Sequence, residues 1–325
     1  MVKVCILGAG AIGGYLGAHL ARSGKCEVSM IARGATLNAI QHEGLTVETP
    51  AGQVKARPRA TDDPATLGHQ DYILLTLKAH QLEAVLPTLA PLIGPDTAIL
   101  PPTTGLPAAF LHGMPGPFGG TPLHGVDPTG LHLRAMPSAQ TLGIVYWIGA
   151  HAEGPGVVRQ DGPRASCMVG ELDGTISPRA TILAALLADA GIPTPVRGNI
   201  RSDIWIKFVN SLCWNPIAVL TGATNGAIHD DSAALRTLRR TMEEADSIAA
   251  ALGVAVPVSL DKRIAVTVSA PAHKMSMLQD LEHGRPLEID VLEASIAAVR
   301  SLAGIATPTI DAVLSLVALR AATAQ

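Results

Sequence analysis

The sequence has few aromatic residues, few charges and no long apolar run. Aromatic residues make up 3% of the 325 residues and charged residues 16%, whereas apolar residues make up 48%. A folded core is therefore expected, and it must be built from Ala, Leu, Val and Ile. No apolar run approaches the ~18 residues that span a bilayer. The sequence thus predicts no membrane segment and a cytoplasmic protein.

Positive charge is not concentrated anywhere in the sequence. The formal net charge is −3, and no block of basic residues occurs along the chain. Nucleic acids and anionic membrane surfaces are bound by such blocks. Neither is therefore an expected partner.

The cysteines show neither a disulfide framework nor a metal site. They are Cys5, Cys26, Cys167 and Cys213, and no Cys-x-x-Cys pair is present. Neither these cysteines nor any pair of histidines has metal-ligand spacing, so no metal is predicted. Scattered thiols of this kind are expected to be reduced, as in cytosolic proteins. The Gly-x-Ser-x-Gly turn of serine hydrolases is also absent, so that class has no support.

The first hundred residues alternate short β-type runs with helical stretches. Strands are expected at residues 2–7, 27–33, 72–77 and 97–100, with one helix ending near residue 22 and another at 81–92. This order predicts an α/β fold with a doubly wound parallel sheet. A small hairpin of residues 45–48 and 53–56 is expected to be inserted in that sheet.

The later sequence changes to long amphipathic helices. Residues 101–165 are rich in Pro and Gly, with strands expected at 141–149 and 157–160, and a helix at 178–190 should end at Gly191. Further helices are expected at 203–220, 232–252, 288–302 and 307–322. We therefore expect a nucleotide-binding domain of residues 1–198 and an all-helical substrate and catalytic domain of residues 199–325. The long helices could bury a homodimer surface.

A Gly-x-Gly-x-x-Gly motif directly follows the first expected strand and opens a helix. Its glycines are Gly8, Gly10 and Gly13, with Ala11 and Ile12 between the last two. The first glycine permits a tight turn, the second lets the backbone approach a pyrophosphate, and the third allows close helix–strand packing. The helix N-terminus then faces the phosphates. A Rossmann-type dinucleotide site is predicted, the alternative being a glycine-rich turn without a ligand.

The end of the second expected strand indicates which dinucleotide binds. Proteins that bind NAD or FAD place an Asp or Glu there to hold the ribose 2′-hydroxyl. Here the strand ends in Arg33, twenty residues after Gly13, and Glu27 stands at its other end. A guanidinium can bind a 2′-phosphate bidentately. NADP(H) is therefore predicted over NAD(H), unless Arg33 is only a solvated loop residue.

With these motifs the sequence resembles the ketopantoate reductase (2-dehydropantoate 2-reductase) family. The resemblance covers nearly the whole chain and is weakest from about residue 106 to 140. Four stretches carry it in the family's order. They are the glycine motif with Arg33, Leu-Lys-Ala-His-Gln at 77–81, Asp-Ile-Trp-Ile-Lys-Phe at 203–208 followed by Asn215-Pro216, and Ser-Met-Leu-Gln-Asp at 276–280 followed by Glu-Ile-Asp at 288–290.

The resemblance implies NADPH-dependent reduction of a 2-oxo acid to a 2-hydroxy acid. Ketopantoate, reduced to pantoate for pantothenate and coenzyme A, is the leading substrate. Lys207 would be the general acid, and Glu288 would hold Lys207 and the substrate hydroxyl. Lys78 would lie where nicotinamide and substrate meet, with Thr104 beside the cofactor. The residues implied to bind substrate are Lys78, Ser211, Asn215, Asn225 and Ser276.

The residue chemistry is consistent with these roles. Carbonyl reduction needs a proton donor where negative charge develops, and a lysine can serve when burial or neighbouring cations lower its pKa. Lys207, Ser211 and Asn215 lie four residues apart and share one helical face. Each residue also has a simpler interpretation: Lys207 as a solvated charge, Glu288 as a first-turn carboxylate, Ser276 as a helix start and Asn225 as turn chemistry.

Three positions depart from the family pattern. Thr104 and Ser211 stand where the family usually or often has Asn, and His273 stands where some members have Asn. Sites that hydrogen-bond a substrate group discriminate strongly, so such changes can redirect specificity. A related reductase or dehydrogenase for another oxo or hydroxy acid is therefore one alternative. The other is a non-catalytic NADPH-binding regulator, although a sensor needs no proton donor such as Lys207.

Overall fold

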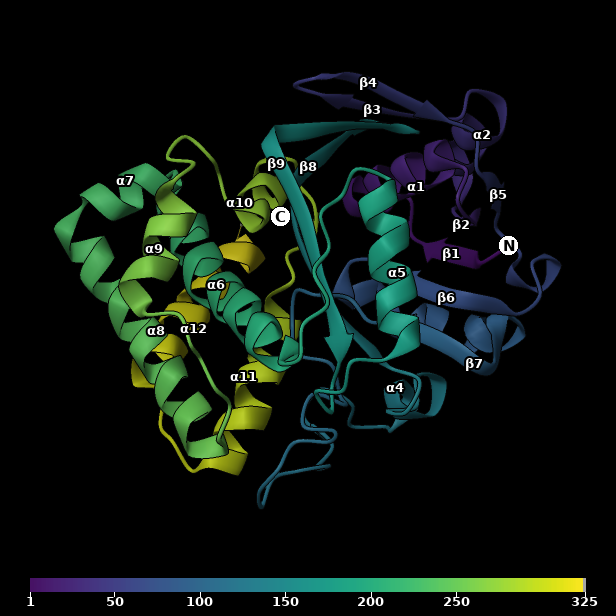
Figure 1. Cartoon of the computed structure of the whole chain (residues 1–325). Coiled ribbons are helices and arrows are strands. Elements are labelled where there is room, and N and C mark those ends of the chain that lie inside the picture. The colour runs from purple at the N-terminus through teal and green to yellow at the C-terminus, as the bar shows by residue number, and fades with distance from the viewer. Residues whose placement is uncertain (324–325) are drawn as a thin grey trace.

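The structure is a computed structural model that describes residues 1–323. Its first sheet contains five parallel strands in the order β5-β2-β1-β6-β7 (Figure 1). They are β1 (Lys3–Leu7), β2 (Glu27–Ile31), β5 (Arg59–Thr61), β6 (Gln70–Leu75) and β7 (Ile93–Leu100). The predicted doubly wound parallel sheet is confirmed. Since all five strands run in one direction, their carboxyl ends meet at one edge.

Both faces of this sheet are buried, as its apolar strands require. Along β1, Val4 and Ile6 contribute to one core, and Cys5 and Leu7 contribute to another on the opposite face. Strands covered on both sides are near-continuously apolar for this reason. The first core includes side chains of α1 (Ala11–Ser23) and α5 (Pro178–Asp189). The second includes side chains of residues 82–92 and of α4 (Leu131–Ala135).

One predicted helix is corrected. The stretch expected to be a helix at 81–92 consists mainly of 3-10 turns, η2 (Ala79–Gln81) and η3 (Leu86–Leu92), around a single α-helical turn, α3 (Leu82–Val85). Pro87 and Pro91 lie in η3. A proline has no N–H to donate and its ring clashes with the preceding turn, so a regular α-helix cannot continue through this stretch.

A second sheet has the strand order β4-β3-β9-β8, and its long strands β8 and β9 lie between the parallel sheet and the helical half (Figure 1). Its strands are β3 (Leu45–Thr49), β4 (Gly52–Ala56), β8 (Leu142–Gly154) and β9 (Val157–Glu171). The predicted hairpin is present, but β3 pairs with β9 in this second sheet instead of being inserted in the parallel one. Strands β8 and β9 also extend well beyond their predicted ends, and so they reach both halves of the molecule.

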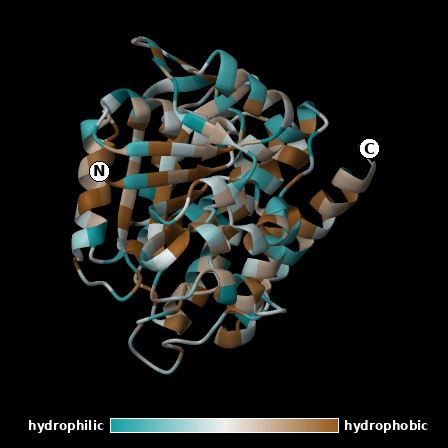
Figure 2. Ribbon diagram, turned by 90° about the vertical axis from the view of Figure 1, so that its right-hand side faces the viewer, coloured by the Kyte–Doolittle hydropathy of each residue, from teal (hydrophilic) through white to brown (hydrophobic). Residues whose placement is uncertain are grey.

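The helical half is built around one long buried helix, α6 (Ile200–Thr221), in which Trp205, Phe208 and Trp214 are fully buried. The others are α7 (Asn225–Asp230), α8 (Ser232–Leu252), α9 (Leu260–Val268), α10 (Ser276–Glu282), α11 (Ile289–Ala303) and α12 (Pro308–Thr323). Figure 2 shows the hydrophobic residues concentrated along the inner strands and helices. Among residues 1–323, no helix combines the length and hydropathy that crossing a bilayer requires.

The Pro- and Gly-rich segment after β7 packs into the core of the helical half. Leu106, Phe110 and Leu111 share that core with α6. The Phe110 ring centroid lies 6.0 Å from that of Trp205. Arg201 donates to the Phe110 carbonyl oxygen at 2.8 Å. A stretch that precedes the predicted boundary at 198 therefore helps to hold α6 in place.

This packing predicts a large stability loss for Phe110→Ala. Removing a fully buried phenyl ring should lower the free energy of unfolding by about 3–5 kcal/mol, through lost transfer energy and a cavity. Urea unfolding measures the change. Phe118→Ala, which truncates a partly buried ring of the same segment, is the control and should cost clearly less. Equal losses for the two variants would contradict the placement of Phe110.

Candidate active site

A pocket of about 970 Å³ opens at the carboxyl edge of the parallel sheet. Loops that follow β1, β2, β6 and β7 form one side of it, and β8, α6, α10 and the start of α11 form the other. Ligands of open α/β sheets bind outside the carboxyl ends of the strands. Because the strands are parallel, the loops after β1, β2, β6 and β7 all lie at the edge of the sheet where such a ligand would bind.

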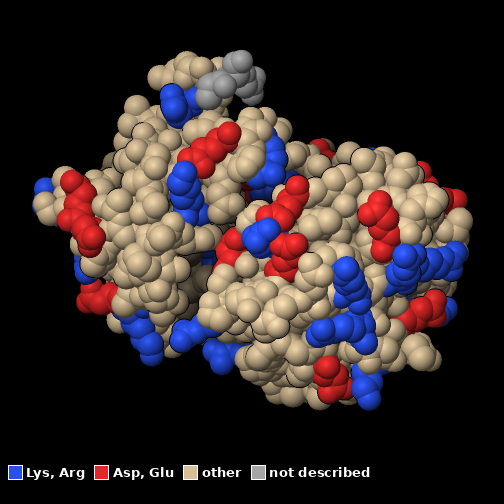
Figure 3. Space-filling model, turned by 90° about the horizontal axis from the view of Figure 1, so that it is seen from above, with Lys and Arg blue, Asp and Glu red and all other residues tan. Residues whose placement is uncertain are grey.

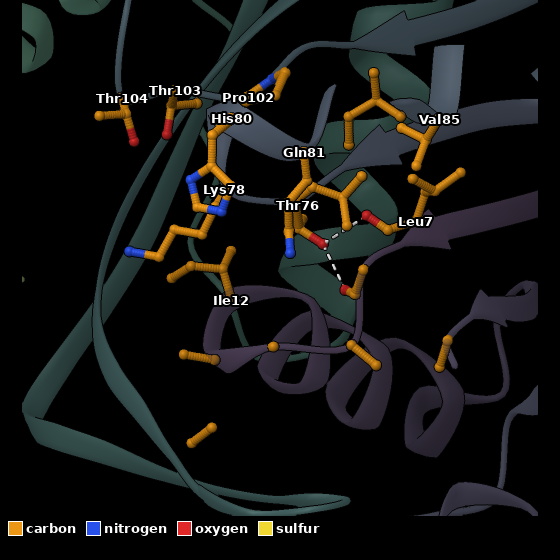
Figure 4. A pocket seen from close by; sticks show the side chains of 18 of the residues that line it. Leu7, Ile12, Thr76, Lys78, His80, Gln81, Val85, Pro102, Thr103 and Thr104 are labelled. Carbon is orange, nitrogen blue, oxygen red and sulfur yellow. Dashed lines mark hydrogen bonds between the residues drawn. The ribbon is translucent and has the colours of Figure 1, made fainter. Parts of the chain in front are cut away.

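The glycine loop between β1 and α1 forms one wall. A Cβ on Gly13 would lie 1.8 Å from the Gly8 carbonyl oxygen and 2.4 Å from the Thr76 hydroxyl oxygen, so no larger residue fits. The Thr76 hydroxyl donates to the Gly8 and Leu7 carbonyl oxygens at 2.7 and 3.2 Å (Figure 4). A Cβ on Gly10, by contrast, would meet nothing within 4 Å. Gly10 therefore leaves open space in the pocket wall, which fits a pyrophosphate.

The far end of the pocket carries the residue expected to select the cofactor. Arg33 is the exposed N-cap residue of α2 (Gly34–His42). Its guanidinium forms no ion pair with any residue in the range 1–323. Thr36 and Asp62 line the same end, and neither was singled out from the sequence. The residues present fit a dinucleotide: an open glycine turn, a helix N-terminus at Ala11 and an unpaired guanidinium.

An ion-pair network joins the strand loops to the helical half. The Lys78 Nζ lies 2.6 Å from Asp280 Oδ2 and 3.3 Å from Glu288 Oε2. Burial lowers the pKa of Lys78, but the two carboxylates outweigh it and the pKa is raised. Figure 4 shows the Lys78 side chain near Ile12, and Thr104 beside Thr103. Lys78 is thus a charged residue on the strand side of the pocket.

The expectation that Glu288 holds Lys207 is corrected by the structure. Its carboxylate accepts hydrogen bonds from the Ala79 backbone N–H at 2.8 Å and from the Thr104 hydroxyl at 3.2 Å, besides pairing with Lys78. Within the described chain, it forms no hydrogen bond with Lys207. Glu288 is also the N-cap residue of α11, yet its side chain makes no capping bond. The donors from the β6 and β7 loops already satisfy this carboxylate.

Lys207 lies on the opposite wall, with Ser211 and Asn215 on the same side of α6. Burial lowers the pKa of its amine to about 8. The Nζ lies 4.7 Å from the centre of the Trp147 ring on β8. No hydrogen bond or ion pair to its Nζ is formed by the residues that the structure describes. A lysine with a pKa of about 8 beside an open pocket is suited to proton donation.

Asn215 positions the start of α10. Its Oδ1 accepts from the Met277 backbone N–H at 3.1 Å and lies 3.5 Å from the Ser276 hydroxyl. Its Nδ2 donates to the Ser211 carbonyl oxygen one turn earlier at 3.1 Å. Asn215 thereby brings Ser276 to the pocket wall, and all three polar side chains line the cavity together with Lys207.

Asn225 is not brought to the pocket. It is buried at the start of α7, and its Nδ2 donates to the Thr267 carbonyl oxygen of α9 at 3.2 Å. It is not among the pocket-lining residues. Packing of α7 against α9 carries the side chain away, which the sequence did not indicate.

Three contributors were missed by sequence reasoning. Thr76 supports the glycine loop and stands directly before the Leu-Lys motif, so its position was a usable signal. Asp280 ends the Ser-Met-Leu-Gln-Asp motif but received no role, although it pairs with Lys78. Trp147 lies sixty residues from Lys207 in the sequence, and only the tertiary structure brings them together.

Charged residues on the face seen in Figure 3 are interspersed, with Lys and Arg next to Asp and Glu. The four cysteines are all free and buried. The pocket therefore remains the feature that indicates function, and its polar groups converge on a small molecule.

The fold and the site together define a pyridine-nucleotide-dependent reductase. The model of the family described as ketopantoate reductase PanE/ApbA matches residues 4–174, and the model of that family's C-terminal part matches residues 199–321. The chain belongs to the ketopantoate reductase family.

Individual relatives agree with this assignment. The chain is 43% identical to the 2-dehydropantoate 2-reductase of Mesorhizobium japonicum, over 97% of each chain. It is 40% identical to a solved Ralstonia solanacearum structure assigned to ketopantoate reductase, with a TM-score of 0.91 over 100% of this chain and 99% of that one.

A D-mandelate dehydrogenase structure with NADH and anilino(oxo)acetate is 24% identical, with a TM-score of 0.82 over 99% of each chain, and shares the fold.

Two glycine variants test the loop geometry. Gly13→Ala places a methyl group against backbone and should lower the free energy of unfolding by about 1–3 kcal/mol. Gly10→Ala, the matched variant, has space for its methyl group, so stability should be unchanged while dinucleotide affinity falls. Thermal unfolding and nicotinamide fluorescence titration measure the two effects. If Gly10→Ala bound the dinucleotide like the wild type, Gly10 would not face the pyrophosphate.

Proposed function

We propose that this protein reduces ketopantoate, or a closely related 2-oxo acid, to the corresponding 2-hydroxy acid with NADPH. The observation that carries the proposal is Lys207, a half-buried lysine whose pKa is lowered by burial to about 8, on the wall of a dinucleotide-sized pocket. A regulator that only bound NADPH would have no use for such a group. The family membership of the chain supports the same reaction.

Lys207 acts as the general acid in this proposal. When bound, the reduced nicotinamide supplies the hydride that reaches the carbonyl carbon. Lys207 gives its proton to the carbonyl oxygen, so the C=O group becomes CH–OH, and the neutral amine regains a proton from water. A pKa of about 8 keeps the amine mostly protonated at neutral pH and still able to release the proton.

The other pocket residues bind and orient. The glycine loop would hold the pyrophosphate through Gly8, Gly10, Ala11 and Ile12, with Gly13 beneath it, and Arg33 would bind the 2′-phosphate. Lys78 and Thr104 would lie at the nicotinamide end, with Glu288 held between them.

The substrate side consists of groups at the helical wall. Ser276 would bind the substrate carboxylate, and Ser211 and Asn215 would hydrogen-bond its remaining oxygens. Another 2-oxo acid is the second candidate because the Thr104 hydroxyl is directed to Glu288, at a position where the family usually has an amide. A hydroxyl cannot reproduce the paired donor and acceptor of an amide.

We also propose a domain division, a cellular location and an oligomeric state for this protein. We take residues 1–198 as the nucleotide-binding domain and 199–325 as the substrate domain, with residues 106–126 packed against the latter. Free, buried cysteines support a cytoplasmic location. Exposed Leu316 and Leu319 on α12 support a homodimer.

Oxidation of NADPH with ketopantoate and a panel of other 2-oxo acids tests the proposal. Lys207→Ala should lower kcat by about 10²- to 10⁴-fold, the usual contribution of a general acid, and should leave NADPH affinity nearly unchanged. In the wild type, kcat for reduction should fall above pH of about 8 as Lys207 loses its proton, whereas the reverse reaction should gain. An active Lys207→Ala variant, or NADPH binding with no turnover of any oxo acid, would refute the proposal.

Arg33→Ala tests the choice of cofactor. Loss of a charge-assisted hydrogen-bonding partner should weaken NADPH binding by about 10- to 100-fold, with little effect on NADH. Fluorescence titration with both nucleotides gives the ratio. Arg22→Ala, in the last turn of α1, is the control and should change neither affinity. Equal weakening of NADPH and NADH would mean that Arg33 does not recognise the 2′-phosphate.

A further inference from the structure

Strand β8 presents side chains to two different environments. Tyr146, Ile148 and Ala150 line the pocket. Since successive residues of a strand point to opposite faces, Trp147 points the other way, and it packs against the core of the helical half. Its ring thereby reaches Lys207 of α6, with 4.7 Å between Nζ and the ring centre.

No carboxylate compensates the charge of Lys207 within the described part of the chain. Glu288 and Asp280 are paired with Lys78 across the pocket, and Asp161 of β9 lies 2.8 Å from His151. A buried ammonium without a partner is costly. An aromatic face is the remaining group that can stabilise it, because the negative face of the ring quadrupole attracts a cation and Trp does so best.

One further titratable group bears on Lys207. His273, in the loop between α9 and α10, has a pKa lowered by burial; Asp161 raises it and Lys207 lowers it further. His273 is therefore neutral in the alkaline range where Lys207 titrates. Lys78 has a raised pKa and keeps its charge in the same range. Neither His273 nor Lys78 changes its charge in this pH range. A change in the pKa of Lys207 can therefore be attributed to the Trp147 contact.

We propose that Trp147 is a positioning residue for Lys207, whose indole face holds the ammonium at the pocket wall and favours its charged form. The importance of this contact for catalysis rests on the proposed function. The contact itself does not, because it concerns the protonation of one side chain. Burial and the ring act in opposite directions on Lys207, and their balance sets the pH range in which it can donate a proton.

Fluorinated tryptophans at position 147 provide the test. Mono-, di- and trifluorinated tryptophan, inserted by nonsense suppression, weaken the ring's negative face in steps and change its size little. Lysine labelled with ¹³C at the ε-carbon reports the pKa of Lys207 by NMR in the full-length protein, and Lys207→Arg identifies the resonance. The pKa should fall stepwise, by about half to one pH unit over the series.

The same series at Trp214 is the matched control. This buried indole lies on α6, the helix of Lys207, but within the described part of the chain it forms no cation–π contact with Lys207, so the Lys207 resonance should titrate unchanged. A pKa that did not move across the Trp147 series, or that moved equally in both series, would overturn the proposal.

Turnover separates this proposal from the proposed function. If Lys207 is the general acid, the pH at which reduction declines should move down with the NMR pKa across the Trp147 series. If the NMR pKa moves while wild-type protein turns over no oxo acid, the cation–π contact stands and the reductase proposal fails. If turnover proceeds and the NMR pKa stays fixed, the reductase proposal stands and the role of Trp147 fails.

Discussion

The pairing of Lys78 with Asp280 and Glu288 is the interaction on which the arrangement of the site depends. Both carboxylates are almost fully buried, and two buried like charges require a cation between them. The cation that both carboxylates share, Lys78, is supplied by the loop after β6, whereas the carboxylates belong to α10 and to the start of α11. Arg285 pairs with Asp280 as well, at 3.0 Å. The network therefore sets how the strand loops face the helical half. The same loop donates the Ala79 N–H to Glu288, and the loop after β7 donates the Thr104 hydroxyl.

Two lysines on opposite walls consequently have opposite properties. Lys78 has two carboxylate neighbours and a raised pKa, so it serves as a permanent charge. Among residues 1–323, no carboxylate pairs with Lys207, and burial lowers its pKa to about 8, so it can exchange a proton. Environments that push the pKa values of like groups apart are a general way to assign roles in an active site. The positions of the carboxylates therefore contribute to the difference in pKa between Lys78 and Lys207.

Two polar side chains, Thr104 and Asn215, contribute to this arrangement. Thr104 directs its hydroxyl to Glu288, so it contributes to the ion-pair network. Asn215 uses its amide oxygen to hold the start of α10, which presents Ser276. These short polar side chains therefore line the same pocket as Lys207.

Local patterns in the amino-acid sequence suffice to predict the parallel sheet, the glycine loop and the long helices. Apolar strand runs, a Gly-x-Gly-x-x-Gly turn and helical periodicity act over a few residues, so they can be recognised from the residues alone. The extent of β8 and β9, the 3-10 turns at Pro87 and Pro91, and the placement of the hairpin in a second sheet depend on contacts distant in sequence or on proline geometry. Only the three-dimensional packing decides that Glu288 faces Lys78, that Asn225 turns away and that Trp147 meets Lys207. Each of these contacts depends on which of several donors, acceptors and rings lie nearest in space. The sequence pattern of one segment does not contain that information.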